Sequence, residues 1–109
     1  MSTLEHEANQ LILRQHVLKE EIKNLKIDIT DDQKELEQLR ATYHHLKDVV
    51  SGEELTNIID QGKLLRKNIM KGEEQKAILL KEFHSLSTQL EQMRSIEAQR
   101  WYYETQKEL

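Results

Sequence analysis

The segment Leu18–Leu39, LKEEIKNLKIDITDDQKELEQL, decides the fold, because apolar residues recur in it at alternating steps of three and four. The same spacing continues in both directions, without a slip, from Leu4 to Val50. A seam of this period follows a narrow stripe along one side of an α-helix, and only another helix can bury such a stripe. The sequence therefore predicts an all-α fold built as a long coiled coil.

The first seam fills positions a and d of a heptad repeat in which Leu4 is at d. Gln15 and Asp32 are its polar members. We expect Gln15 to set the register, as polar residues at position a commonly do. We expect Asp32 to mark a soft stretch, since two facing carboxylates would repel. The apolar residues that we expect to form a dimerisation seam are Leu4, Leu11, Leu18, Ile22, Leu25, Ile29, Leu36, Leu39, Tyr43, Leu46 and Val50.

The seam is interrupted at residues 50–54, because Leu55 begins a new register too soon for the first one to continue. Ser51 with Glu54 forms a capping-box pattern, which predicts that a second helix begins there. We therefore divide the chain into a first coiled-coil segment, 1–50, and a second, weaker one, 51–109, with a helix break or register shift at 51–54. The second seam contains Leu55, Ile58, Leu65, Ile69, Leu79, Phe83, Leu86, Leu90 and Met93.

Gly62, Gly72 and Lys76 weaken this second seam. A glycine costs about 1 kcal/mol relative to alanine inside a helix. We interpret the two glycines as a sign of a weaker and more mobile stretch. The alternative is that a partner helix comes close there, or that the helix has a hinge.

Two arrangements bury the seams, and the side chains favour an extended parallel dimer. β-Branched residues at a with leucine at d are typical of two parallel strands. The flanking charges agree, because in a parallel pair Glu21 meets Lys26 and Glu35 meets Arg40. The alternative is an antiparallel helical hairpin that forms a bundle, in which Leu18 lies near Phe83. Apolar residues off the seam suggest further helices: Ile12, Leu13, Val17, Ile27, Ile59, Leu64, Ile78, Leu80 and Ile96.

The composition is that of a long helix. A third of the 109 residues are charged, few are aromatic, and the sequence contains neither proline nor cysteine. Acids and bases alternate, which argues against a nucleic-acid-binding protein. The basic stretch Lys63, Arg66, Lys67 and Lys71 could touch phosphate or an acidic partner, although Glu73 and Glu74 dilute it. The five histidines show no i, i+4 pair, so we expect no metal site. The sequence has no Gly-rich phosphate loop and no Ser-His-Asp order, and a coiled coil implies no concave pocket, so we also expect no cofactor, no small-molecule substrate and no enzymatic activity.

Trp101, Tyr102 and Tyr103 follow the end of the second seam. Exposed aromatics often anchor protein interfaces, so these three are candidates for docking a partner or for capping the other helix. The first nine residues do not form a secretory signal, and no run approaches the roughly 20 apolar residues of a membrane helix. We expect a soluble intracellular protein, cytoplasmic, cytoskeletal or nuclear, or a piece of a longer rod.

The pattern resembles the coiled coils of cytoskeletal, ciliary, kinetochore and vesicle-tethering assemblies. The resemblance implies a structural scaffold that pairs with itself, as a homodimer, or with another coiled-coil protein, and that docks partner proteins. The other hypothesis is a regulatory helical hairpin that pairs with a partner's helix and releases it by opening.

Overall fold

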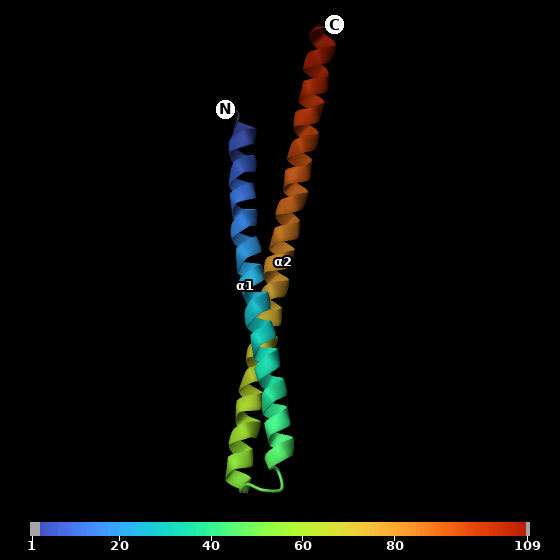
Figure 1. Cartoon of the computed structure of the whole chain (residues 1–109). Helices are drawn as coiled ribbons and strands as arrows, with labels where there is room; N and C mark the ends of the chain where they lie inside the picture. Colours follow the sequence, from blue (N-terminus) through green and yellow to red (C-terminus); the bar gives the residue numbers. More distant parts are fainter. Residues whose placement is uncertain (1–2, 109) are drawn as a thin grey trace. The chain divides into compact units, whose positions relative to one another are not determined.

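The computed structural model describes residues 3–108, and of residues 102 and 105–108 only the backbone. Two long helices make up nearly all of this part: α1 spans Thr3–Leu46 and α2 spans Gly52–Glu108, with no strand among the residues described (Figure 1). The predicted all-α fold is confirmed. The predicted helix break is also present, and it lies slightly earlier in the chain than expected, at residues 47–51.

Backbone hydrogen bonds close α1, and a serine side chain opens α2. The amides of Val49 and Val50 both donate to the carbonyl oxygen of Leu46, at 2.9 and 3.0 Å. The hydroxyl of Ser51 then accepts the amide N–H of Glu54 at 3.4 Å, as an N-cap residue does. No described residue has a positive φ. The start of α2 therefore rests on the Ser51 cap rather than on the conformational freedom of Gly52.

The chain divides into two compact units, and each contains a piece of both helices. The first, here called the loop unit, is Ile22–Ile78 and includes the turn between the helices. The second, here called the terminal unit, comprises residues 1–21 and 79–109. Within the loop unit the two helical segments run antiparallel, which brings Leu36 beside Gly62 and Ile29 beside Gly72. Within the terminal unit the two segments are also antiparallel, with Leu4 beside Met93 and Arg14 beside Glu82.

The loop unit thus has the hairpin arrangement, and the preference for an extended parallel dimer is corrected to that extent. The first seam faces the second seam of the same chain, so it needs no second copy to be covered. The hydrogen bond from Gln15 to Ser87 in the terminal unit follows nearly the same register as the predicted pairing of Leu18 with Phe83.

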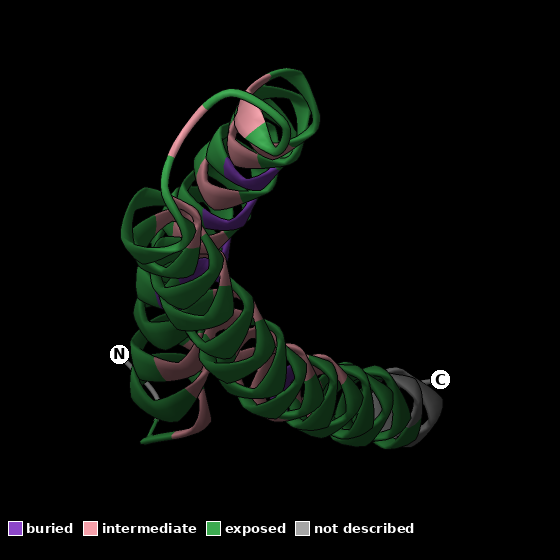
Figure 2. Ribbon diagram, turned by 90° about the horizontal axis from the view of Figure 1, so that it is seen from below, coloured by how far each residue is buried: buried purple, intermediate pink, exposed green. Residues whose placement is uncertain are grey.

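The core of each unit is thin. In the loop unit Ile22, Ile29, Leu36 and Leu65 are buried, and in the terminal unit Leu18 and Leu86 are buried. Leu18 is the only one of these that is fully enclosed, at 0% exposure. Figure 2 shows that most of both ribbons is exposed and that the buried residues are few. Two paired helices therefore leave most of their outer surface open to other molecules.

Candidate functional site

The residues that α1 and α2 bury against each other lie mainly on the predicted seams. Every described residue of α1 that is buried or half-buried lies on the first seam. In α2 the half-buried or buried residues are those of the second seam together with Leu80, Glu82 and Ser87. Their role as a dimerisation seam stays a prediction, because one chain alone is described.

The polar seam residue Gln15 is used within the terminal unit. Its Nε2 donates to the hydroxyl of Ser87 at 2.8 Å, and that hydroxyl donates to the carbonyl oxygen of Phe83 at 3.2 Å. Because both partners are half-buried, a shift in register would leave polar groups without hydrogen bonds. Gln15 is thus placed to fix how α1 and α2 align in this unit.

An ion pair lies beside that hydrogen bond. Arg14 donates to Glu82 through Nε at 3.1 Å and through Nη2 at 3.4 Å. The hydrogen bond to Glu82, and after it the attraction of the same carboxylate, raises the pKa of Arg14. The guanidinium therefore keeps its charge throughout the ordinary pH range. Both side chains are solvated, so the pair selects the alignment more than it adds stability.

The two seam glycines have different surroundings, and both lie in the loop unit. A Cβ at residue 72 would lie 2.9 Å from Cγ1 of Ile29, closer than carbon atoms can approach. At residue 62 it would lie 3.7 Å from Cδ1 of Leu36, an ordinary contact. Close approach of a helix, rather than local mobility, therefore accounts for Gly72, and the approaching helix is α1 of the same chain.

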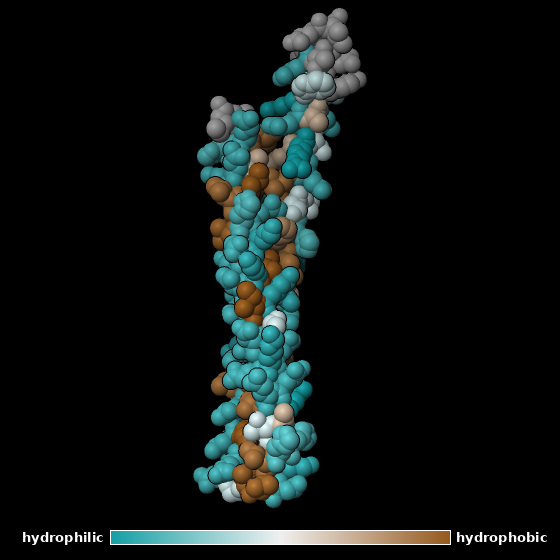
Figure 3. Space-filling view, in the orientation of Figure 1, coloured by the Kyte–Doolittle hydropathy of each residue, from teal (hydrophilic) through white to brown (hydrophobic). Residues whose placement is uncertain are grey.

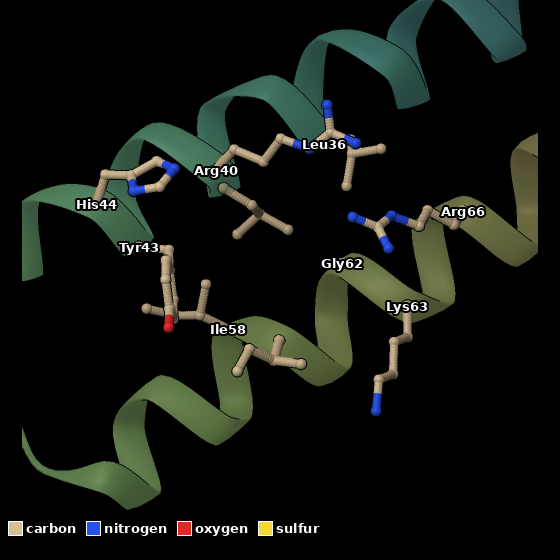
Figure 4. A pocket seen from close by; sticks show the side chains of 10 residues that line it. Leu36, Arg40, Tyr43, His44, Ile58, Gly62, Lys63 and Arg66 are labelled. Atoms are coloured by element: carbon tan, nitrogen blue, oxygen red, sulfur yellow. The ribbon is translucent and has the colours of Figure 1, made fainter. Parts of the chain in front are cut away.

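Near the turn, the loop unit carries a groove of about 400 Å³, here called the basic groove (Figure 4). Both helices contribute to it. Its apolar and aromatic lining consists of Leu36, Leu39, Tyr43, Ile58 and Ile59, with Gly62 between them. Its basic and imidazole side chains are Arg40 and His44 from α1 and Lys63 and Arg66 from α2.

The charges of the basic groove have one sign. No aspartate or glutamate lines it. In Figure 4 the guanidinium of Arg66 reaches from α2 toward α1, that of Arg40 runs along α1 toward Leu36, and Lys63 points away from α1. Among the described residues, no ion pair within 4.0 Å involves Arg40, Lys63 or Arg66. The groove thus combines an apolar floor with cations that form no ion pair within 4.0 Å among the described residues.

A second groove of the loop unit has the opposite charge. Asp28, Asp31 and Asp32 line it together with a single cation, Lys71. The predicted basic stretch is therefore divided by the structure. Lys63 and Arg66 line the basic groove, Lys71 lines the acidic one, and Lys67 lines neither. Sequence reasoning grouped these residues because they are close in the chain, and it missed Arg40, which only the hairpin brings to Arg66.

The apolar residues predicted to lie off the seam remain on the surface. Leu80 is half-buried, and the other eight are exposed, with Leu13, Leu64 and Ile78 each about 60% exposed or more. Figure 3 shows apolar residues reaching the surface among hydrophilic ones. Trp101 and Tyr103 are exposed at 68% and 65%, and the side chain of Tyr102 lies outside the described residues.

Neither a cluster of metal-ligating side chains nor a membrane-spanning helix is present among the described residues. Among the described residues, no three His, Asp or Glu side chains gather in a way that could hold a metal ion. The His6 ring nitrogen lies 3.1 Å from the side-chain amide of Gln10. Neither α1 nor α2, as far as described, is apolar enough over a sufficient length to cross a bilayer.

The comparisons with known proteins found no matching family model, no similar curated protein and no similar solved structure.

Proposed function

We propose that this chain is a non-enzymatic structural protein that docks other helical proteins, and further copies of itself, through the outer faces of its paired helices. The observation that carries the proposal is the set of exposed apolar side chains off the seam, including Leu13, Leu64 and Ile78. Two paired helices do not need these residues. Large apolar side chains on the outer faces of paired helices offer contact surface to a further helix, as the apolar parts of protein interfaces do.

The proposal places the chain in an intracellular scaffold of the kind that coiled coils form in cytoskeletal, ciliary, kinetochore or tethering assemblies. Its mechanism is spacing and docking, without chemistry. Trp101 and Tyr103 add an aromatic element to the terminal unit, and aromatic side chains are frequent anchors of such contacts.

Proximity labelling with the full chain in cells tests the proposal. The test variant carries Leu13→Gln, Leu64→Gln and Ile78→Gln, all at exposed sites. The proposal predicts unchanged helicity and melting temperature, since exposed substitutions usually change stability by no more than about 0.5 kcal/mol. It also predicts loss of the neighbours labelled by the unaltered chain. Retention of the same neighbours by the variant contradicts the proposal.

The hairpin of the loop unit favours a second candidate, a regulatory module that pairs with a partner helix by opening. A disulfide introduced by the double substitution Ile29→Cys, Gly72→Cys would hold the hairpin closed, because Cγ1 of Ile29 lies 2.9 Å from a Cβ at residue 72. A module that works by opening loses its partners when oxidised and regains them when reduced. A scaffold that docks through its outer faces keeps them in both states.

A further inference from the structure

We propose that the basic groove of the loop unit binds an amphipathic helix from another protein, with acidic residues flanking its apolar stripe. The inference deepens the proposed function and rests on it. It is carried by the apolar floor of Leu36, Leu39, Ile58 and Ile59 together with the cations Arg40 and Arg66.

The dimensions of the groove suit two turns of a helix. Its lining extends over residues 36–44 of α1 and 58–66 of α2, which corresponds to about 12 Å at 1.5 Å per residue. A helix lying along it would present apolar side chains at i, i+3 or i+4, and i+7, the usual anchors of a helix in a groove. Gly62 leaves space in the floor, where a larger side chain would fill part of the groove.

The charges specify the flanks of the bound helix. Arg40 and Arg66 lie on opposite helices of the groove, and no carboxylate lines it. A guanidinium binds a carboxylate through two parallel hydrogen bonds, more strongly and more directionally than a neutral donor does. Glutamate or aspartate on either side of an apolar stripe would neutralise cations that the described chain leaves without an ion pair.

Other occupants fit the groove less well. A second copy of the chain, meeting groove to groove, would set cations against cations. A flat lipid surface would not reach an apolar floor recessed between two helices. The phosphates of a nucleic acid would bind the cations, but they would make no favourable contact with the leucine and isoleucine side chains of the floor.

Selection from a displayed library of amphipathic helices tests the proposal. Every library member has leucine at i, i+3 and i+7 and random residues at the flanking positions, and the full chain is the immobilised target. We expect acidic residues to be enriched at the flanks. The variant R40E/R66E should bind the selected helices about tenfold more weakly or worse, and should itself select basic flanks.

The matched control is K34E/K67E. It makes the same change of charge on the same two helices of the loop unit, at exposed residues outside the groove. We expect its affinity for the selected helices to stay within about twofold of the unaltered chain, because surface charges away from a site contribute little. Circular dichroism checks that both variants remain helical.

Each other result overturns the proposal in a recognisable way. The groove does not select helices with acidic flanks if neutral or basic flanks are enriched, or if both variants lose affinity equally. Selected helices that ignore both substitutions bind elsewhere, so the groove proposal fails while the proposed function stands. If no helix is selected, the groove proposal fails, and proximity labelling with the variant at Leu13, Leu64 and Ile78 decides the proposed function separately. Binding of phosphatidylserine vesicles or of an oligonucleotide that depends on Arg40 and Arg66, without any helix, reassigns the groove to lipid or nucleic acid. A change in the self-association of R40E/R66E reassigns it to a second copy.

Discussion

Gly62 and Gly72 both lie on the second seam, Gly62 at position a and Gly72 at position d, and their steric surroundings differ. A Cβ fits at residue 62, with its nearest contact at 3.7 Å, but at residue 72 it would lie 2.9 Å from Cγ1 of Ile29. Cγ1 is close to the backbone of a buried, β-branched residue, so it cannot simply rotate away. The sequence alone could not separate the two glycines, because only the distance to the opposite helix does so.

Alanine substitutions at the two glycines should therefore differ in effect, and only Gly62→Ala should stabilise the fold. Gly62→Ala should raise the free energy of unfolding by about 1 kcal/mol, the gain in helix propensity. Gly72→Ala gains the same propensity but overpacks against Ile29, at a cost of about 1–3 kcal/mol, so it should be neutral or destabilising. Chemical denaturation followed by circular dichroism measures both. In the background Ile29→Ala, which removes the contact, Gly72→Ala should become stabilising, and if it does not, the close contact is not the cause.

Leu18 and Leu13 make a second contrast within the terminal unit. Leu18 is 0% exposed and Leu13 is 66% exposed, on the same helix. Leu18→Ala should lower the free energy of unfolding by about 2–5 kcal/mol, as large-to-small changes in a core do. Leu13→Ala should change it by less than about 0.5 kcal/mol. Equal effects in thermal melts of the two variants would show that the predicted seam is not the stripe that α2 covers.

At the scale of the elements, the beginning of α2 depends on Ser51. Its hydroxyl accepts the amide of Glu54, which would otherwise be one of the unpaired donors at the helix start. Ser51→Ala should lower the free energy of unfolding by about 1 kcal/mol. The control is Ser95→Ala, at an exposed site inside α2, where alanine is the better helix former. A melting temperature that falls equally in both variants would argue against a capping role.

The helices and their seams could be predicted from the sequence, because the spacing of apolar residues depends only on helix geometry. The pairing of the helices could not be decided in that way. In an antiparallel pair, position g faces g, and an antiparallel homodimer would set the acidic g positions of the first segment against each other. Within each unit of the hairpin, the acidic g positions of α1 instead come opposite g positions of α2 that are uncharged amides: Gln61 and Asn68 in the loop unit and Gln89 in the terminal unit. The acidic g positions of the first segment therefore do not repel one another in the hairpin, as they would in an antiparallel homodimer.

The candidate site was predictable only in part. Lys63 and Arg66 stood out in the sequence as part of a basic stretch. Arg40 and His44 lie on the other helix, before the turn that connects the two helices. Only the antiparallel pairing in the loop unit brings these four residues to one groove. The apolar residues off the seam could be recognised from the sequence, because they exceed the number that two paired helices bury.

At the scale of the whole molecule, a single chain supplies both halves of its own coiled coil. The seams cover each other within the loop unit and within the terminal unit, so the residues left for other molecules are those on the outer faces. The proposal that the chain docks other proteins follows from these exposed outer faces. If the seams instead paired between parallel chains, the basic groove would not exist, because Arg40 and Arg66 would lie at separate levels of a rod.

Disulfide formation in the double variant Ile29→Cys, Gly72→Cys tests this claim most directly, since the natural sequence has no cysteine. The two positions are within disulfide reach in the hairpin. After mild oxidation of a mixture of isotope-labelled and unlabelled chains, mass spectrometry identifies the linked peptides. We expect a link between positions 29 and 72 within single chains, and none in the control Ile27→Cys, Gly72→Cys, whose residue 27 is exposed. Links between chains that join position 29 to position 29 and position 72 to position 72 would contradict it and would restore the parallel dimer.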